Sequence, residues 1–284
     1  MDVSGTLCNI ARHIIRLGMQ NSKNICEERP NLLHKYYPPD RIDVLRDGKI
    51  SYSPPVRFND PFDSNPAVCS AQDNETLEQE WNKCREDLPS LAGPTLEEWK
   101  FHHRTHGEIF NNNIQTDLVR NWNSLFGVFC VSENAFDTMM LSHYSDNHRG
   151  FIVTFDADNP FFTRRMGRVT YTNIRPILNQ PDNPELVWMT KSSCWSYEKE
   201  WRSLEELKVC EQKIVNQSGG NVTIYLRKYP KIAVLRIMCG CNMSPETTTY
   251  LQSNLREWGY VCDVVKAVMH PTKYEFTFEK LSLV

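Results

Sequence analysis

The sequence has no long uninterrupted run of apolar residues and no large excess of charge of one sign. No stretch approaches the roughly 18 apolar residues that a membrane span requires, and the net charge of the 284 residues is -3. This balance gives no support for a general attraction to nucleic acid or to a membrane. The apolar core of a secretion signal is also missing, because Arg12, His13 and Arg16 interrupt the run around Ile14. We therefore expect a cytoplasmic protein without a membrane partner.

Several common motifs are absent as well. The chain has no Gly-x-Gly-x-x-Gly, no P-loop and no Gly-x-Ser-x-Gly elbow, which argues against a Rossmann cofactor site, a P-loop nucleotide site and a serine nucleophile. The ten cysteines are scattered singly except for Cys239 and Cys241, which have no second Cys or His pair at zinc spacing. We expect reduced thiols and no metal.

The length of the chain suits one domain with a sizeable core. In residues 1–30, apolar residues at helical spacing predict an amphipathic helix, which we interpret as an N-terminal extension. Residues 31–284 then form a single domain. Within it, a stretch at about 75–122 is rich in Glu, Lys, Leu and Trp and predicts a pair of inserted helices.

Most of the remaining segments carry strand signals. Residues 32–53 predict a strand, a short helix capped by Gly48 and a second strand. Further strands are predicted at 127–131, 151–155, 168–172, 196–204, 222–226, 232–237, 262–267 and 274–278, with one helix at 245–258. Because these strands cluster after the helices instead of alternating with them, we expect an α+β fold with a mixed or antiparallel sheet.

The segment from Trp195 to Arg202 contains a pair of acids. If it is a strand, Glu198 and Glu200 lie on one face and the aromatic residues bury the other. Two carboxylates held by a rigid strand are suited to stabilise a sugar-like oxocarbenium transition state. The alternative is a surface strand whose charged side chains are simply solvated.

Other polar and aromatic residues occur at predicted strand ends and in ordered loops. These candidates are Lys35, Tyr36, Ser53, Asn59, Asp60, His143 and Tyr144. A nicotinamide ring and its ribose need an aromatic plate, hydrogen-bond donors and a nearby acid, which this set offers. His143 is alternatively a structural hydrogen-bonded residue. His102 and His106 share a predicted helix face, but without a third ligand at fixed spacing we favour surface histidines.

Six segments together resemble an uncharacterised bacterial family known as domain of unknown function 2971. In the order and approximate spacing of the family they are residues 33–37, 45–55, 58–63, 127–132, 142–151 and 197–202. The resemblance spans residues 32 to 280. It departs from the family at Leu141, where the pattern has Trp, and in the N-terminal helix.

More distantly, the arrangement is similar to the ADP-ribosyltransferase superfamily, which cleaves NAD at its nicotinamide bond within a split, mostly antiparallel sheet. The resemblance implies Tyr36 or Lys35 at the first-strand position and His143 or Tyr144 at the middle position. Glu200 then corresponds to the catalytic acid, and Glu198 completes a Glu-x-Glu arrangement.

The same resemblance implies roles for the remaining candidates. Ser53 is a companion in the pocket, Tyr36 and Tyr144 are plates for the nicotinamide, and Arg202 or Lys35 engages the pyrophosphate. Asn59 and Asp60 lie in the loop that borders the pocket.

We therefore expect an enzyme that consumes NAD as its substrate, an ADP-ribosyltransferase or NAD glycohydrolase, and the bacterial resemblance implies a toxin-like or phage-defence effector. The acceptor, a protein or a nucleic acid, and the oligomeric state stay open. One alternative is a non-enzymatic module that senses or binds a nucleotide. Another is a metal-dependent nuclease that uses the histidine cluster with Asp60 or Asp63.

Overall fold

The computed structural model describes residues 30–67, 74–87, 94–163, 166–177, 186–217 and 220–282. The predicted N-terminal helix lies outside the described residues, and so do the side chains of His102 and His106. No helix within the described ranges is long and apolar enough to cross a membrane.

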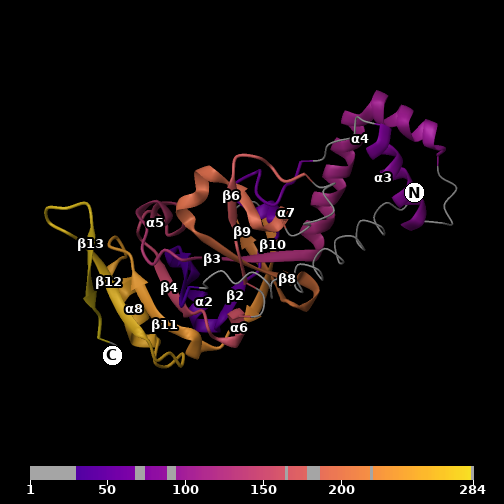
Figure 1. Ribbon diagram of the computed structural model, residues 1–284. Coiled ribbons are helices and arrows are strands. Elements are labelled where there is room, and N and C mark those ends of the chain that lie inside the picture. Colours follow the sequence, from indigo (N-terminus) through magenta and orange to yellow (C-terminus); the bar gives the residue numbers. More distant parts are fainter. Residues whose placement is uncertain are drawn as a thin grey trace.

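The body of the protein is built around an eight-stranded sheet of order β13-β12-β11-β4-β1-β3-β8-β5 (Figure 1). Its strands are β1 (Leu32–Tyr37), β3 (Phe126–Ser132), β4 (Phe151–Asp156), β5 (Met166–Arg168), β8 (Glu200–Glu206), β11 (Val234–Cys239), β12 (Asp263–Met269) and β13 (Phe276–Lys280). β11 and β12 run parallel, whereas the other neighbours are antiparallel. The predicted α+β fold with a mixed sheet is thus confirmed.

The sheet opens between β1 and β3. β1 pairs with β4 along its whole length, from Leu32 to Tyr37. On its other side it pairs with β3 at one position only, His34 opposite Ser132. β3 is in turn fully paired with β8, from Phe126 to Ser132. The two halves of the sheet are therefore each continuous, and this single pair of residues joins them.

Two smaller sheets accompany the large one. The first has the order β2-β10-β9, with β2 (Lys49–Ser51), β9 (Glu211–Gln217) and β10 (Gly220–Lys228), and the second pairs β6 (Thr170–Thr172) with β7 (Thr190–Ser192). Ser53 exchanges two backbone hydrogen bonds of 3.0 and 2.9 Å with Val128 of β3. This bridge fixes the segment after β2 against the opened sheet.

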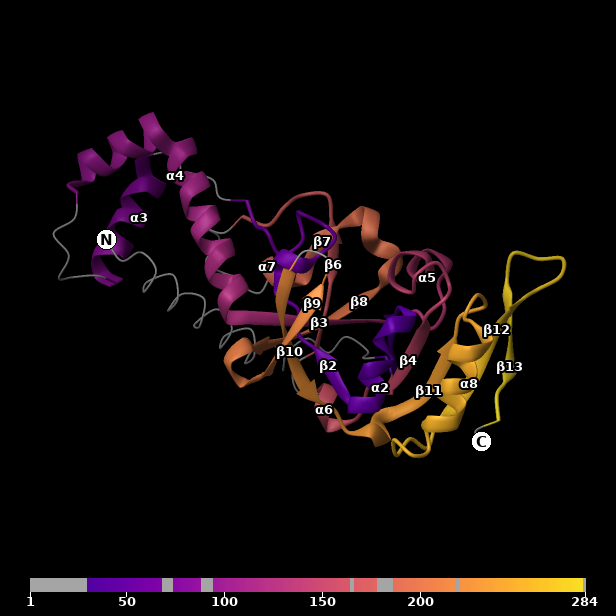
Figure 2. The same cartoon turned by 180° about the vertical axis from the view of Figure 1, so that it is seen from behind.

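The predicted helical pair is present as α3 (Asn74–Asp87) and α4 (Leu96–Leu125). A capping box explains why α4 begins where it does, because the Thr95 side chain accepts from the Glu98 backbone N–H and Glu98 accepts from the Thr95 backbone N–H. α4 passes directly into β3. The two helices α3 and α4 project from the body of the protein (Figures 1 and 2).

The remaining elements are short. The α-helices are α2 (Asp43–Asp47), α5 (Thr138–Tyr144), α6 (Pro160–Thr163), α7 (Leu186–Met189) and α8 (Pro245–Asn254). The 3-10 helices are η1 (Pro39–Ile42), η2 (Pro55–Arg57), η3 (Ser193–Glu198), η4 (Leu207–Val209) and η5 (Lys231–Ala233). As predicted, α2 ends at Gly48, whose φ of 61° is the left-handed conformation that glycine tolerates.

Among the residues that the structure describes, three clusters of buried apolar side chains hold these elements together. The largest lies on the main sheet and includes Leu33, Phe129 and Phe155. A second joins the end of α4 to α7, where the rings of Trp122 and Trp188 lie 5.0 Å apart. The third packs α5 against β1 and β4, and contains Tyr36, Met140, Leu141, Ile152 and Met238. The clusters lie on different parts of the fold, so the opened seam is supported from several sides.

Gly150 permits a close approach of two chain segments just before β4. A Cβ atom added there would lie 1.9 Å from the carbonyl oxygen of Tyr37. The Gly150 carbonyl also accepts a 2.9 Å hydrogen bond from the N–H of Gly240, at the end of β11. The segment before β4 is thus clamped between the ends of β1 and β11.

We expect Gly150→Ala to lower the free energy of unfolding by about 3 kcal/mol or more, because the methyl group clashes with backbone that cannot rotate away. Urea unfolding followed by circular dichroism measures this. Gly167→Ala is the matched control, since its nearest neighbour is the flexible end of Met189 at 3.1 Å. Equal stability of the two variants would contradict the proposed clamp.

Candidate functional site

The segment that carries the acid pair differs from the prediction. Residues 193 to 198 form the 3-10 helix η3, and β8 begins only at Glu200. Lys199 between them has φ 42°, a left-handed conformation. Trp195 and Tyr197 are partly exposed, so the predicted aromatic backing is wrong for both, whereas Trp201 is buried. The turn at Lys199, not strand alternation, brings Glu198 and Glu200 to the same place.

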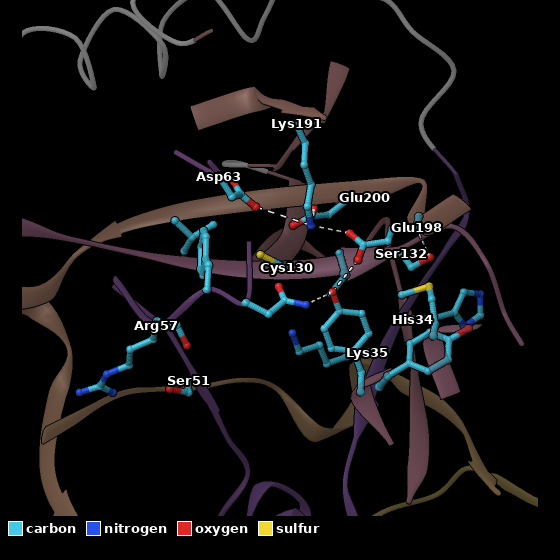
Figure 3. A pocket seen from close by; sticks show the side chains of 18 residues that line it. His34, Lys35, Ser51, Arg57, Asp63, Cys130, Ser132, Lys191, Glu198 and Glu200 are labelled. Carbon is cyan, nitrogen blue, oxygen red and sulfur yellow. Dashed lines mark hydrogen bonds and ion pairs between the residues drawn. The ribbon is translucent and has the colours of Figure 1, made fainter. Parts of the chain in front are cut away.

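The two acids line a cavity of about 270 Å³ at the opening between β1 and β3 (Figure 3). Its walls come from β1, β2, the loop after β2, β3, α5, β7, η3 and β8. The lining residues are His34, Lys35, Tyr36, Ser51, Ser53, Arg57, Phe58, Asn59, Asp63, Val128, Cys130, Val131, Ser132, Met140, Tyr144, Lys191, Glu198 and Glu200. Segments far apart in the sequence therefore contribute to one site.

Arg202 organises the inner wall of the site. Its side chain is 0% exposed and forms two bidentate ion pairs. The guanidinium donates to both oxygens of Asp63, at 2.7 and 2.6 Å, and to both oxygens of Glu200, at 2.8 and 3.0 Å. Such paired, charge-assisted hydrogen bonds offset the cost of burying these charges and fix the orientation of both carboxylates.

Lys191 of β7 joins the second acid to this cluster. Its Nζ lies 2.6 Å from Glu198 Oε2, 3.1 Å from Glu200 Oε2 and 3.5 Å from Asp63 Oδ2. When all five groups are ionised, three carboxylates face two cations, Lys191 and Arg202, and one negative charge is left over. The ion cluster itself then carries one net negative charge, and such a charge favours a positive charge that develops in a ligand beside Glu198 and Glu200.

Glu198 is the acid best placed to exchange a proton. Its Oε1 accepts a 2.5 Å hydrogen bond from the hydroxyl of Tyr144, which in turn accepts from Asn59 Nδ2 at 3.2 Å. Burial raises the pKa of Glu198, and Lys191 only partly opposes this effect. Its backbone is held by Ser132, whose hydroxyl donates to the Glu198 carbonyl at 2.5 Å.

Glu200 has the opposite electrostatic environment. Burial disfavours its ionised form, but the charges of Arg202 and then Lys191 outweigh burial and hold the pKa of Glu200 well below its usual range. Glu200 is thus a fixed negative charge, whereas Glu198 can take up and release a proton. Two acids whose surroundings shift their pKa values apart are typical of acid-base sites.

The structure brings most of the sequence-predicted site residues together. Those that line the cavity are Lys35, Tyr36, Ser53, Asn59, Tyr144, Glu198 and Glu200. Tyr36 is nevertheless packed in the core, and its hydroxyl donates to the Asn134 carbonyl and accepts from the Asp137 N–H, each at 3.0 Å. Because both hydrogen bonds hold the Tyr36 side chain in place, the residue forms part of the cavity wall, and its ring is not free to stack on a nicotinamide.

Three candidates lie outside the cavity lining. The predicted role of Arg202 in binding pyrophosphate is wrong, because its guanidinium is fully buried and engaged with Asp63 and Glu200. Asp60 is buried in its own loop, where Oδ1 accepts from the Phe62 N–H at 2.9 Å. His143 is exposed, and its ring contacts those of neighbouring aromatic residues beside the cavity.

Sequence reasoning did not predict the ion pairs of two residues that hold the acids, Lys191 and Asp63, and it named Asp63 only as a candidate metal ligand. Asp63 ends the segment 58–63 that carries part of the family resemblance. The segment marks Asp63 as a residue of interest, but it does not indicate the ion pair with Arg202. Lys191 gave no sequence signal, since the strand β7 that presents it is only three residues long. Their roles depend on contacts between distant segments.

We compared the chain with models of known protein families, with curated proteins and with solved structures, and none of them matches. The two family resemblances drawn from the sequence therefore stay predictions.

Removing the central cation tests the ion cluster. We expect Arg202→Met to lower the free energy of unfolding by about 3–5 kcal/mol, because it leaves Asp63 and Glu200 buried with less compensation. Arg149→Met is the control, since its pair with Asp146 is exposed and should be worth less than about 1 kcal/mol. Similar losses in both variants, measured by urea unfolding, would contradict the importance of the cluster.

His34 gives the fold a dependence on pH. It is buried at the single β1–β3 contact, its Nδ1 lies 3.0 Å from Thr154 Oγ1, and burial followed by the charge of Arg236 lowers its pKa from 6.5 to about 4. Between these values the unfolded chain binds the proton more tightly, so His34 contributes less to stability as the pH falls.

We expect this contribution to shrink by about 3 kcal/mol between pH 7 and pH 4. Urea unfolding of wild type and His34→Gln over this range measures it, and the pH dependence should be weaker in the variant. His143→Gln, which removes an exposed imidazole, is the control. Parallel curves for wild type and His34→Gln would show that His34 makes no such contribution.

Proposed function

We propose that the cavity cleaves the bond between nicotinamide and ribose in NAD, as an ADP-ribosyltransferase or an NAD glycohydrolase does. The observation that carries the proposal is the convergence of Glu198 and Glu200 in one cavity, with pKa values shifted in opposite directions. The remaining negative charge of the ion cluster supports it, because cleavage of this bond develops positive charge on the sugar.

The size of the cavity limits what it encloses. About 270 Å³ is at the lower end of ligand pockets, so it accommodates the nicotinamide and its ribose, and the rest of the dinucleotide extends outward. Because Arg202 and Lys191 are engaged with carboxylates, Lys35 and Arg57 are the lysine and arginine of the cavity lining that remain for the pyrophosphate. Arg57 is exposed and donates to the Thr223 carbonyl, which leaves other guanidinium N–H groups available.

The two acids divide the chemistry. Glu200, kept ionised by Arg202, supplies the negative charge that favours the oxocarbenium-like transition state as nicotinamide leaves with the bonding electron pair. Glu198 accepts the proton of the attacking group, either water or an acceptor. The sequence resemblance implied that Glu200 was the catalytic acid, and this assignment keeps Glu200 as the electrostatic stabiliser and gives the proton transfer to Glu198.

Tyr144 has a positioning role in this scheme. Its hydroxyl donates to Glu198 Oε1 and accepts from Asn59, so it fixes the carboxylate of the base. A residue in this position affects the rate through the orientation and the pKa of Glu198. The ring of Tyr144 lines the cavity, where it is also available to contact a planar ligand.

We expect Glu198→Gln to lower the rate of nicotinamide release from NAD by about a hundredfold or more, because the amide cannot accept the proton. Chromatographic quantification of NAD and nicotinamide measures this. Glu206→Gln, in the same strand as Glu200 but outside the cavity lining, is the control and should retain wild-type turnover. Retained turnover in Glu198→Gln would reject the assignment.

The assay for nicotinamide release, combined with calorimetry, separates the rival functions. Binding of NAD by calorimetry without any product, in the presence or absence of candidate acceptors, would favour a sensor or binding module. A strict requirement for a divalent cation would favour the nuclease alternative. Asp63 is a poor candidate for a metal ligand, however, because both oxygens of its carboxylate accept hydrogen bonds from Arg202.

A further inference from the structure

Lys35 occupies a distinct position in the cavity. Strand alternation in β1 places it on the face of Leu33 and Tyr37, which both belong to the main core. Because β1 and β3 pair at one position only, its side chain nevertheless reaches the cavity at their opening. Figure 3 shows Lys35 across the cavity from Lys191, the other lysine of the site.

The two lysines differ in their partners. Lys191 is ion-paired with three carboxylates. Within the described part of the chain, the Lys35 amine has neither a hydrogen bond nor an ion pair, and its Nζ lies 5.5 Å from the centre of the Phe129 ring. Burial lowers the pKa of Lys35, and the opposing effects of Cys130 and Glu200 are smaller. An amine that has no hydrogen bond or ion pair among the described residues, and whose pKa is lowered by burial, is a potential nucleophile.

We propose that Lys35 forms a covalent imine with the aldehyde group of an open-chain aldose that enters the cavity. The proposal uses the acids of the same site but does not require NAD to be the substrate. It assigns to Lys35 a chemical role that the pyrophosphate contact alone does not include.

The walls of the cavity favour a sugar over a simple aldehyde. Side chains that can bond hydroxyl groups line the same cavity as Lys35, and they include Ser51, Ser53 and Asn59. Arg57 lies at the same side of the cavity, where its exposed guanidinium can bind a phosphate (Figure 3). The class of ligand that fits these groups is a phosphorylated aldose in its aldehyde form.

The reaction needs no oxidant or metal. The lone pair of Lys35 Nζ forms a bond to the carbonyl carbon, and the π electrons of the carbonyl move to its oxygen, which takes a proton from protonated Glu198. The nitrogen then loses a proton to the Glu198 carboxylate. Glu198, protonated again by this transfer, gives its proton to the oxygen, which leaves as water with the C–O bonding pair, and the nitrogen lone pair completes the C=N bond. Glu198, with its raised pKa, is suited to all three proton transfers.

Reductive trapping tests the imine. The full chain is incubated with D-ribose 5-phosphate and sodium cyanoborohydride, which converts the imine into a stable secondary amine, and the modified lysines are found by peptide mass mapping. We expect Lys35 to be modified at least about tenfold faster than Lys199, an exposed lysine next to the acids in sequence. Modification of the exposed lysines with Lys35 unmodified would overturn the proposal.

Two variants sharpen the result. Lys35→Met removes the amine with little change in side-chain length, so adduct formation at this position is lost while the melting temperature stays close to that of wild type. Glu198→Gln should slow the modification of Lys35 by about a hundredfold and leave that of Lys199 unchanged. An unchanged rate of Lys35 modification in Glu198→Gln would show that Glu198 does not transfer the protons of the proposed step.

The outcome is independent of the assay for NAD cleavage. An adduct on Lys35 in a protein that does not release nicotinamide would reject the NAD assignment and retain the imine. Loss of NAD turnover in Glu198→Gln without any adduct on Lys35 would do the reverse.

Discussion

The guanidinium of Arg202 lies between two carboxylates that come from distant parts of the chain, and the geometry of the site depends on these two bidentate ion pairs. One joins β8 to the loop after β2 through Asp63, and the other fixes Glu200 in its own strand. Lys191 extends the cluster to Glu198. Because buried charges are costly unless they are paired, no member can turn away without leaving another uncompensated. The cluster thereby specifies how the loop, β7, η3 and β8 meet.

The same cluster explains why two neighbouring acids have different properties. Glu200 shares its oxygens with Arg202 and Lys191, so its negative charge is fixed. Glu198 lies at the end of the network and meets Lys191 and a neutral hydroxyl, that of Tyr144. Burial consequently has the larger effect on Glu198. A division of roles between a permanent charge and a proton carrier follows from the position of each acid relative to one arginine.

The sequence predicted most of the secondary structure because those signals are local. The strand Leu32–Tyr37, the cap at Gly48 and the paired helices follow from alternation, glycine conformation and helical periodicity. It failed at η3, where the aromatic and acidic residues happened to alternate as they do in a strand. It predicted that Glu198 and Glu200 act together, but it wrongly predicted that the guanidinium of Arg202 is free to bind a ligand. Ion pairs between distant segments, such as Asp63 with Arg202, leave no local pattern to detect.

The junction between α4 and β3 has a structural consequence. Leu125 is the last residue of the helix and Phe126 the first of the strand, with the Phe126 N–H still donating to the carbonyl of Trp122. No loop separates the two elements, so a single peptide bond joins the end of the helix to the start of the strand. The strand that continues the long helix also carries Cys130 and Ser132, so the anchorage of the projecting helix and the floor of the cavity share one element.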